Sequence, residues 1–355
     1  MLMEVETGEF WLPLDEQTSV FNFLNGQASI EGKEHFLMFN SNINALLVYD
    51  LEIQNVVNRV TFPTEGPNAM PPLGISAGMK YVNSDTVIFF SKVQNRLYLT
   101  NLQGAVYKSI NVGRDNLQLG SVDVVTPLAY RKGKLYIQLL PSDISLSLKE
   151  INSQPLVVTA IDLDTGVQKD HEIPFPDIYM DERISYQLKM VDIVYDQRRD
   201  KFVLSLPLQD EILLTNLDGS EPTYHSAKSG LVKDVELVKQ KKNIPANQIT
   251  SYRYWLSDAY GKLMYDQSSG YYFREARSGI GEEAYLNRSF KTKKEIVILG
   301  PDLNQVGVMA FEDGESILYQ FATEGKLFLN RNFKEYNFER QNEDTLYFKS
   351  MTYID

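Results

Sequence analysis

The sequence contains no cysteine in 355 residues and only three histidines. The lack of thiols excludes disulfides, thiolate metal sites, iron–sulfur clusters and cysteine nucleophiles. His35 lies at the start of a predicted strand, and His171 and His225 lie on outer strands that face solvent. We therefore expect surface histidines, and neither a catalytic triad nor a multi-histidine metal site. The prediction is no metal, no cofactor and no catalytic residue.

Positive charge is also scarce. Lys and Arg number 35 against 47 Asp and Glu, which gives a net charge of −12. Because phosphate backbones and anionic lipids repel such a chain, we expect no nucleic-acid partner and no binding to membrane surfaces. No apolar run approaches the length of a membrane span. Residues 1–4 show neither the basic nor the apolar part of a signal peptide, so a cytoplasmic location is one expectation.

A short sequence motif recurs along the chain, at the end of one run of β-forming residues and the beginning of the next. Its copies contain a tight turn and carry the leucines Leu51, Leu102, Leu163, Leu217 and Leu303. Self-similarity at this spacing is typical of a β-propeller, with one such turn in each blade.

Residues 79–112 show one blade most clearly, with four short β-runs separated by turns. Similar blades are predicted over residues 27–62, 126–174, 190–227, 252–311 and 315–355. The last blade lacks one strand, which residues 9–24 can supply, and this closure hides the sheet edges. We therefore predict an all-β, six-bladed propeller in one domain over residues 1–355. The long gap between Leu217 and Leu303 leaves seven blades as the alternative.

The connections differ in length between the two faces of the predicted disc. The turns between the first and second strands, and between the third and fourth, are short and share one face. The long insertions belong to the other face; they are residues 63–78, 141–154, 174–189, 228–251, 277–293 and 331–343. Because binding residues concentrate on loops that a rigid scaffold holds, we expect a ligand at the channel mouth on this long-loop face.

The segment Ser251–Trp255 places two tyrosines, an arginine and a tryptophan within five residues. It is predicted to enter an inner strand, where alternation sends Arg253 and Trp255 to one side. Packing between blades is the more common explanation of such a segment. The predicted ligand-binding residues on the long-loop face are Glu65, Asn68, Arg183, Arg253, Trp255 and Arg274.

The chain resembles a known family in four regions: residues 48–51, 61–68, 260–266 with 271–274, and 296–304. The family consists of uncharacterised Bacteroidetes lipoproteins with a TolB-like six-bladed propeller (domain of unknown function 4221). The resemblance implies a periplasmic or outer-membrane-anchored location and no assigned activity. The positions that match the family pattern are Glu65, Gly66, Pro67, Asn68, Tyr265, Asp266, Tyr272 and Arg274.

These observations favour a non-enzymatic binding or scaffolding protein of the cell envelope. Its partner is an unknown small molecule, glycan or protein, and the chain is expected to be a monomer. The alternative is a carbohydrate-active hydrolase or lyase that uses channel carboxylates. A buried carboxylate pair with a raised pKa favours the enzyme, whereas an aromatic-lined opening without such a pair favours binding.

Overall fold

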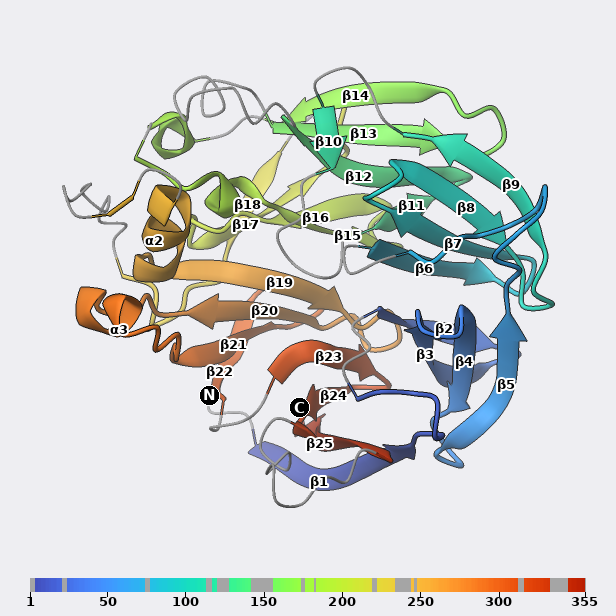
Figure 1. The fold of residues 1–355 in the computed structure, drawn as a ribbon. Coiled ribbons are helices and arrows are strands. Elements are labelled where there is room, and N and C mark those ends of the chain that lie inside the picture. Colours follow the sequence, from blue (N-terminus) through green and yellow to red (C-terminus); the bar gives the residue numbers. More distant parts are fainter. Residues whose placement is uncertain are drawn as a thin grey trace.

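The computed structural model of the chain is a ring of six antiparallel sheets, which are the blades of a β-propeller (Figure 1). The described residues are 4–20, 24–73, 77–112, 117–119, 128–141, 156–173, 176–181, 183–218, 222–233, 244–245, 248–311, 316–332 and 344–354. Six sheets confirm the preferred number of blades over the alternative of seven.

Each blade follows the chain from its innermost to its outermost strand. The first three blades contain β2 (Asn25–Ile30), β3 (Lys33–Asn40), β4 (Ala45–Asp50) and β5 (Asn55–Thr61); β6 (Ala77–Asn83), β7 (Thr86–Ser91), β8 (Arg96–Thr100) and β9 (Val106–Asn111); and β11 (Ala129–Arg131), β12 (Lys134–Pro141), β13 (Leu156–Asp162) and β14 (Gln168–Ile173), with β10 (Leu117–Leu119) also paired to β12.

The last three blades have the same pattern, except that the sixth takes its outer strand from the N-terminus. They contain β15 (Asp192–Asp196), β16 (Lys201–Ser205), β17 (Glu211–Thr215) and β18 (Thr223–Ser226); β19 (Ala259–Tyr265), β20 (Tyr272–Arg277), β21 (Lys294–Leu299) and β22 (Gln305–Ala310); and β23 (Ser316–Thr323), β24 (Lys326–Asn330), β25 (Thr345–Ile354) and β1 (Glu4–Pro13).

In the part of the chain that the structure describes, the short helices lie in the long connections. These are the 3₁₀ turns η1 (Asp177–Met180) and η2 (Tyr186–Lys189), and the α-helices α2 (Ile249–Leu256) and α3 (Glu282–Leu286). No helix in the described part of the chain is long and apolar enough to cross a membrane.

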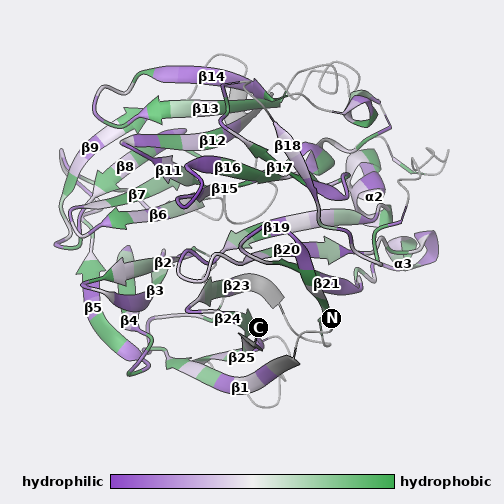
Figure 2. Ribbon diagram, turned by 180° about the vertical axis from the view of Figure 1, so that it is seen from behind, coloured by the Kyte–Doolittle hydropathy of each residue, from purple (hydrophilic) through white to green (hydrophobic). Residues whose placement is uncertain are grey.

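Burial explains why the middle strands are apolar and the outer strands are not. In β7 every residue after Thr86 is buried, because both faces of the blade pack on neighbouring blades. In β9 only Val106 and Ile110 are buried, since an outer strand contacts solvent. Figure 2 shows the same contrast between the hydrophilic β14 and the hydrophobic β13 beside it.

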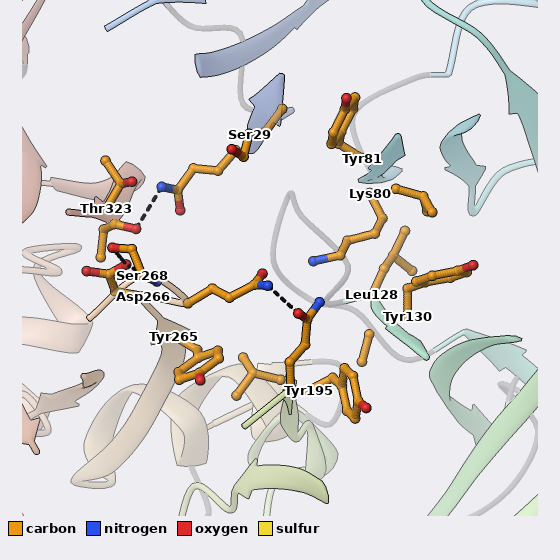
Figure 3. Close-up of a pocket in the computed structure, with 18 of the residues that line it drawn as sticks. Ser29, Lys80, Tyr81, Leu128, Tyr130, Tyr195, Tyr265, Asp266, Ser268 and Thr323 are labelled. Carbon is orange, nitrogen blue, oxygen red and sulfur yellow. Dashed lines mark hydrogen bonds between the residues drawn. The ribbon is translucent and has the colours of Figure 1, made fainter. Parts of the chain in front are cut away.

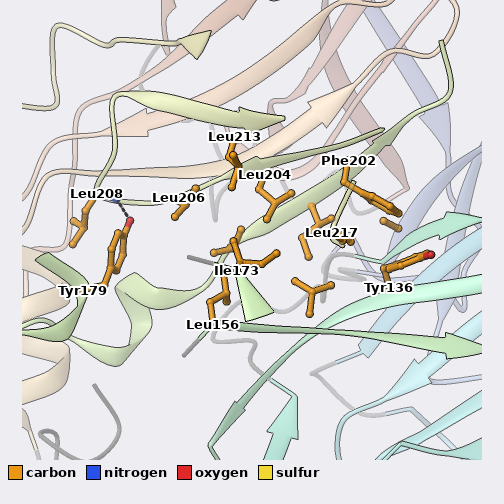
Figure 4. Close-up of a cluster of buried hydrophobic side chains, with 14 of the residues drawn as sticks. Tyr136, Leu156, Ile173, Tyr179, Phe202, Leu204, Leu206, Leu208, Leu213 and Leu217 are labelled. Atoms are coloured by element: carbon orange, nitrogen blue, oxygen red, sulfur yellow. Dashed lines mark hydrogen bonds between the residues drawn. The ribbon is translucent and has the colours of Figure 1, made fainter. Parts of the chain in front are cut away.

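The core consists of apolar layers between adjacent blades. Between blades 3 and 4, Leu156, Leu204 and Leu213 are fully buried (Figure 4). At the end of this layer the Tyr136 and Phe202 rings lie 4.4 Å apart. Each of the other blade pairs shares a comparable cluster of buried side chains. Stability therefore depends on the blades remaining in contact around the whole ring.

The recurring leucine motif forms turns in which a side chain accepts hydrogen bonds from backbone N–H groups. In blade 3, Asp162 Oδ1 accepts hydrogen bonds from the backbone N–H groups of Asp164 and Thr165. Asp50 and Asn101 hold the equivalent turns in the same way. These acceptors keep Asp162 in a turn, as short polar side chains commonly do.

The ring closes through the N-terminal strand. β1 pairs antiparallel with β25 over ten positions, from Glu4 opposite Ile354 to Pro13 opposite Thr345. Phe10 on β1 packs edge-on against Phe328, at 4.9 Å between ring centroids. The predicted closure is confirmed, although the strand lies at 4–13 rather than across 9–24. Residues 21–23, also predicted as β-forming, lie outside the described residues.

Two local predictions are wrong. Ser251–Trp255 forms α2 instead of entering an inner strand, so blade 5 begins at Ala259. The helix persists because Tyr252 is buried against Tyr285 of α3, and because the Arg277 guanidinium donates to the carbonyl oxygens of Tyr254 and Ser257 at its C-terminus. His35 is buried on β3 rather than on the surface.

Adjacent residues of β1 test the closure. Leu12 is fully buried in the layer between blades 6 and 1, whereas the side chain of Trp11 is 52% exposed. We expect Leu12→Ala to lower the free energy of unfolding by about 2–5 kcal/mol. Trp11→Ala should change it by only about 0.5–1 kcal/mol. Urea unfolding of both variants measures the difference, and equal losses would contradict a closing role for β1.

Candidate functional site

A cavity of about 560 Å³ lies on the propeller axis (Figure 3). All six inner strands line it near their C-terminal ends, which lead into the short turns between first and second strands. The cavity therefore occupies the short-turn end of the channel, opposite the face on which we predicted the ligand. Its volume is in the range of about 300–1,000 Å³ that is common for small-molecule sites.

Tyrosines form much of the cavity wall. One lies shortly before the first short turn in each of blades 2 to 5: Tyr81, Tyr130, Tyr195 and Tyr265. The Tyr195 hydroxyl donates to Asp200, and the Tyr265 hydroxyl donates to Asp196 at 3.0 Å. Because carboxylates hold these two hydroxyls, the rings of Tyr195 and Tyr265 are fixed in the wall.

Among the described residues, two carboxylates line the cavity, and both have structural partners. Asp266 accepts hydrogen bonds from the hydroxyls of Ser268 and Ser269. Its Oδ2 also accepts from the Gly325 N–H at 2.8 Å, which joins blade 5 to blade 6. Glu34 accepts from the Thr323 hydroxyl at 2.8 Å, across the seam between blades 1 and 6.

The turn that follows Asp266 requires a glycine. Gly270 has φ +84° and donates its N–H to the Asp266 carbonyl oxygen. A Cβ at this position would collide with the Arg198 guanidinium, which donates to the carbonyl oxygens of Ser268 and Ser269. The Arg198 contacts fix the turn of blade 5 against the equivalent turn of blade 4.

The cation Lys80 extends from β6 into the cavity (Figure 3). Its side chain is exposed to the cavity, which all six inner strands line. Desolvation there lowers the pKa of the Lys80 ammonium below its usual value.

A buried carboxylate lies in the wall between blades 4 and 5. Asp196 is fully buried and accepts hydrogen bonds from the Tyr265 and Tyr272 hydroxyls and from the Arg199 guanidinium. Burial raises its pKa, but the hydrogen bonds outweigh burial and the net pKa of Asp196 is lowered. Tyr265 and Tyr272 are two of the family-like positions, and both hold Asp196 in this wall, while Tyr265 also lines the cavity.

Arg274, a predicted ligand contact, also lies inside this wall. It is completely buried and donates to the Ser205 hydroxyl and to three backbone carbonyl oxygens, those of Leu206, Gln209 and Ala227. Its guanidinium lies 3.6 Å from the centre of the Tyr260 ring. Burial lowers the pKa of Arg274 to about 10. These contacts join blade 5 to blade 4. They use the guanidinium of Arg274 within the wall, whereas we predicted that it contacts a ligand.

The other predicted residues lie on the long-loop face, in separate places. Glu65 and Asn68 are exposed on the connection between blades 1 and 2. That connection is anchored by Asn44, whose side-chain amide donates to the carbonyl oxygens of Phe62 and Met70. Arg183 is exposed before η2 and pairs with Asp181 at 2.5 Å.

Arg183 and Arg253 act on the same carboxylate. The hydrogen bond from Arg183 and the nearby charge of Arg253 lower the pKa of Asp181 to about 2. Arg253 is buried on α2, and Trp255 of the same helix packs on Phe290 at 4.9 Å between ring centroids. The structure thus brings Arg183 and Arg253 together, while Glu65 and Asn68 belong to another blade junction.

Sequence reasoning missed the cavity and Lys80. The available signal was the tyrosine shortly before the short turn in four of the blades. Within the described residues, no group of three or more His, Cys, Asp or Glu is placed to hold a metal ion.

A closed six-bladed propeller with a polar axial cavity defines the class of this protein. The chain belongs to the DUF4221 family, a domain of unknown function, whose family model matches residues 12–307. This confirms the resemblance found in the sequence.

Two crystal structures of Bacteroides proteins share the fold. A DUF4221 member from Bacteroides vulgatus is 19% identical, with a TM-score of 0.80 over 100% of both chains. A candidate exported protein from Bacteroides fragilis is 11% identical, with a TM-score of 0.56 over 99% of this chain and 96% of the other. None of the curated proteins matches this chain.

The pH dependence of stability tests the Asp196 network. A lowered folded-state pKa gives a stabilisation that is present above the unfolded pKa of about 3.9 and is lost as the pH falls through the folded value. Asp196→Asn should therefore be less stable than the wild type at pH 7, by about 2 kcal/mol or more. The difference should shrink between pH 4 and pH 2. Urea unfolding measures it, with the exposed Asp164→Asn as a control; a difference independent of pH would refute the assignment.

The variants Arg274→Met and Arg183→Met provide a second comparison of a buried and an exposed side chain. Arg274→Met leaves several buried acceptors unpaired and should cost about 3 kcal/mol or more of unfolding free energy. Arg183→Met breaks an exposed pair and should cost about 0–1 kcal/mol. Unfolding by denaturant compares the two variants. Arg274→Met with wild-type stability would show that its contacts between blades are dispensable.

Proposed function

We propose that this protein is a non-enzymatic binding propeller whose ligand occupies the axial cavity at the short-turn end. The observation that carries the proposal is the cavity itself, a space of about 560 Å³ lined by all six inner strands. Tyrosines and a few polar groups in a concave site are typical of small-molecule binding. The proposal keeps the predicted binding role but moves the ligand to the other end of the channel.

The state of the cavity carboxylates supports binding over the alternative of a carbohydrate-active hydrolase or lyase. Asp266 is occupied by the donors of its own turn, and Glu34 is occupied by Thr323 at the ring seam. A general acid and base have to exchange protons with a substrate, so carboxylates committed to structural hydrogen bonds are poor candidates.

A second candidate surface lies on the long-loop face, where the ligand was first predicted. Phe290, beside Trp255, is 42% exposed, and Leu286 at the end of α3 is 61% exposed. Exposed apolar groups of this kind occur where proteins meet a partner, so this surface suits a protein or glycan partner. Arg253→Ala or Trp255→Ala tests this site.

We also propose a location in the cell envelope, in the periplasm or at the outer membrane. The similar fold of the candidate exported protein from Bacteroides fragilis supports it, as does the family resemblance seen in the sequence. Fractionation of the native host with an antibody against this chain would test the location, and recovery in the cytoplasmic fraction would refute it.

A thermal-shift screen with small polar compounds tests the binding role. A ligand that binds only the folded state raises the melting temperature. We expect at least one compound to do so in the wild type and not in Ser29→Trp, because Ser29 is exposed to the cavity and an indole there occupies part of the space that a ligand needs.

The pattern across variants then identifies the site. Loss of the shift in Trp255→Ala but not in Ser29→Trp would move the ligand to the long-loop face. A screen without any hit would overturn the proposed function.

A further inference from the structure

Of the charged side chains that the structure describes in the cavity, one has no hydrogen-bond or ion-pair partner. The carboxylate oxygens of Asp266 and Glu34 accept hydrogen bonds from hydroxyls and, at Asp266, from a backbone N–H. Among the described residues, the Lys80 ammonium makes no ion pair and no hydrogen bond. An enclosed cation without a partner is costly, and a bound anion removes that cost.

The position of Lys80 makes the cation available to a ligand. Lys80 lies in the C-terminal half of β6, opposite Ile88 of β7 in the strand register. Its neighbour Met79 is buried in the layer between blades 1 and 2, so Lys80 points away from that layer. In Figure 3 Lys80 lies on the opposite side of the cavity from Asp266 and Thr323, and its ammonium reaches toward the middle.

The remaining polar groups in the cavity suit hydroxyls. The side-chain amide N–H of Gln267 donates to the side-chain oxygen of Gln197, and this bond ties blade 5 to blade 4. That pairing leaves the amide N–H groups of Gln197 and the carbonyl oxygen of Gln267 for a ligand, within the described part of the site. Ser29 adds a hydroxyl from blade 1 and is exposed to the cavity.

We infer that the cavity binds a small hydroxylated carboxylate, of the sugar-acid class, whose carboxylate pairs with Lys80. The hydroxyls of the ligand bind the Gln197–Gln267 pair and Ser29, and its apolar ring face lies against the tyrosine wall. This inference rests on the proposed function, because it names the ligand class of the same cavity. A charged hydrogen bond in an enclosed site is stronger than a neutral one, so the carboxylate contributes most of the discrimination.

Titration calorimetry with D-glucuronate and its neutral amide, D-glucuronamide, tests the inference. The two compounds have nearly the same shape and differ in charge. We expect the wild type to bind the acid about 10- to 100-fold more tightly than the amide. Lys80→Met should remove this preference, whereas Lys169→Met, which changes an exposed lysine on β14, should keep it.

Stability serves as the internal control. Because Lys80 has no partner among the described residues, Lys80→Met should melt at or above the wild-type temperature. Lys80→Gln provides a second neutral variant with a polar end. Retention of the full preference for the acid in both variants would overturn the inference.

Further binding measurements distinguish a failure of the ligand class from a failure of the proposed function on which it rests. Equally tight, Lys80-dependent binding of inorganic phosphate would show a general anion site and overturn the carboxylate assignment. Binding of neither glucuronate nor glucuronamide would also overturn it. The proposed function would still stand if a neutral compound from the screen bound the wild type and was blocked by Ser29→Trp.

Discussion

The pairing of β1 with β25 joins the two ends of the chain, and the rest of the ring depends on it. Each blade has an apolar surface on both sides, so each needs a neighbour on both sides. Without the N-terminal strand, the sixth blade would expose the free edge of β25 and lose Phe10 and Leu12 from the layer that it shares with blade 1. A closed ring with no free blade is the condition under which all six layers are buried together.

The same closure creates the axial cavity. Six inner strands converge on one axis, and their ends bring together residues that are far apart in the chain, such as Glu34 and Thr323. Blade-to-blade hydrogen bonds at the short turns then fix the shape of the cavity. Arg198 holds the blade 5 turn, and Asp266 holds the turn of blade 6. The short turns are thus rigid, and rigidity favours a preformed binding site.

The wall between blades 4 and 5 contains buried charged groups beside its apolar cluster. Asp196 and Arg274 are both buried there, and each is surrounded by hydrogen-bond partners. Removing the hydrogen-bond partners of Asp196 or of Arg274 leaves a buried charge unsatisfied, so each of these residues constrains the side chains around it. This accounts for Tyr265, Tyr272 and Arg274 as structural members of the family pattern. It also shows why a polar motif in a sequence is not by itself a binding motif.

The sequence alone determined the architecture of this protein. The spacing of the leucine turns, the alternation of β-runs and the incomplete last blade predict six blades and closure by the N-terminus, because these features depend on local turn chemistry and on the need to hide strand edges. The sequence did not reveal that Ser251–Trp255 is a helix, since its stability comes from packing of Tyr252 on Tyr285 and from Arg277. Nor did it show that Arg274 is buried or that Lys80 faces the axis. Those outcomes depend on which residues of six separate blades meet at one point, and only the tertiary structure decides that.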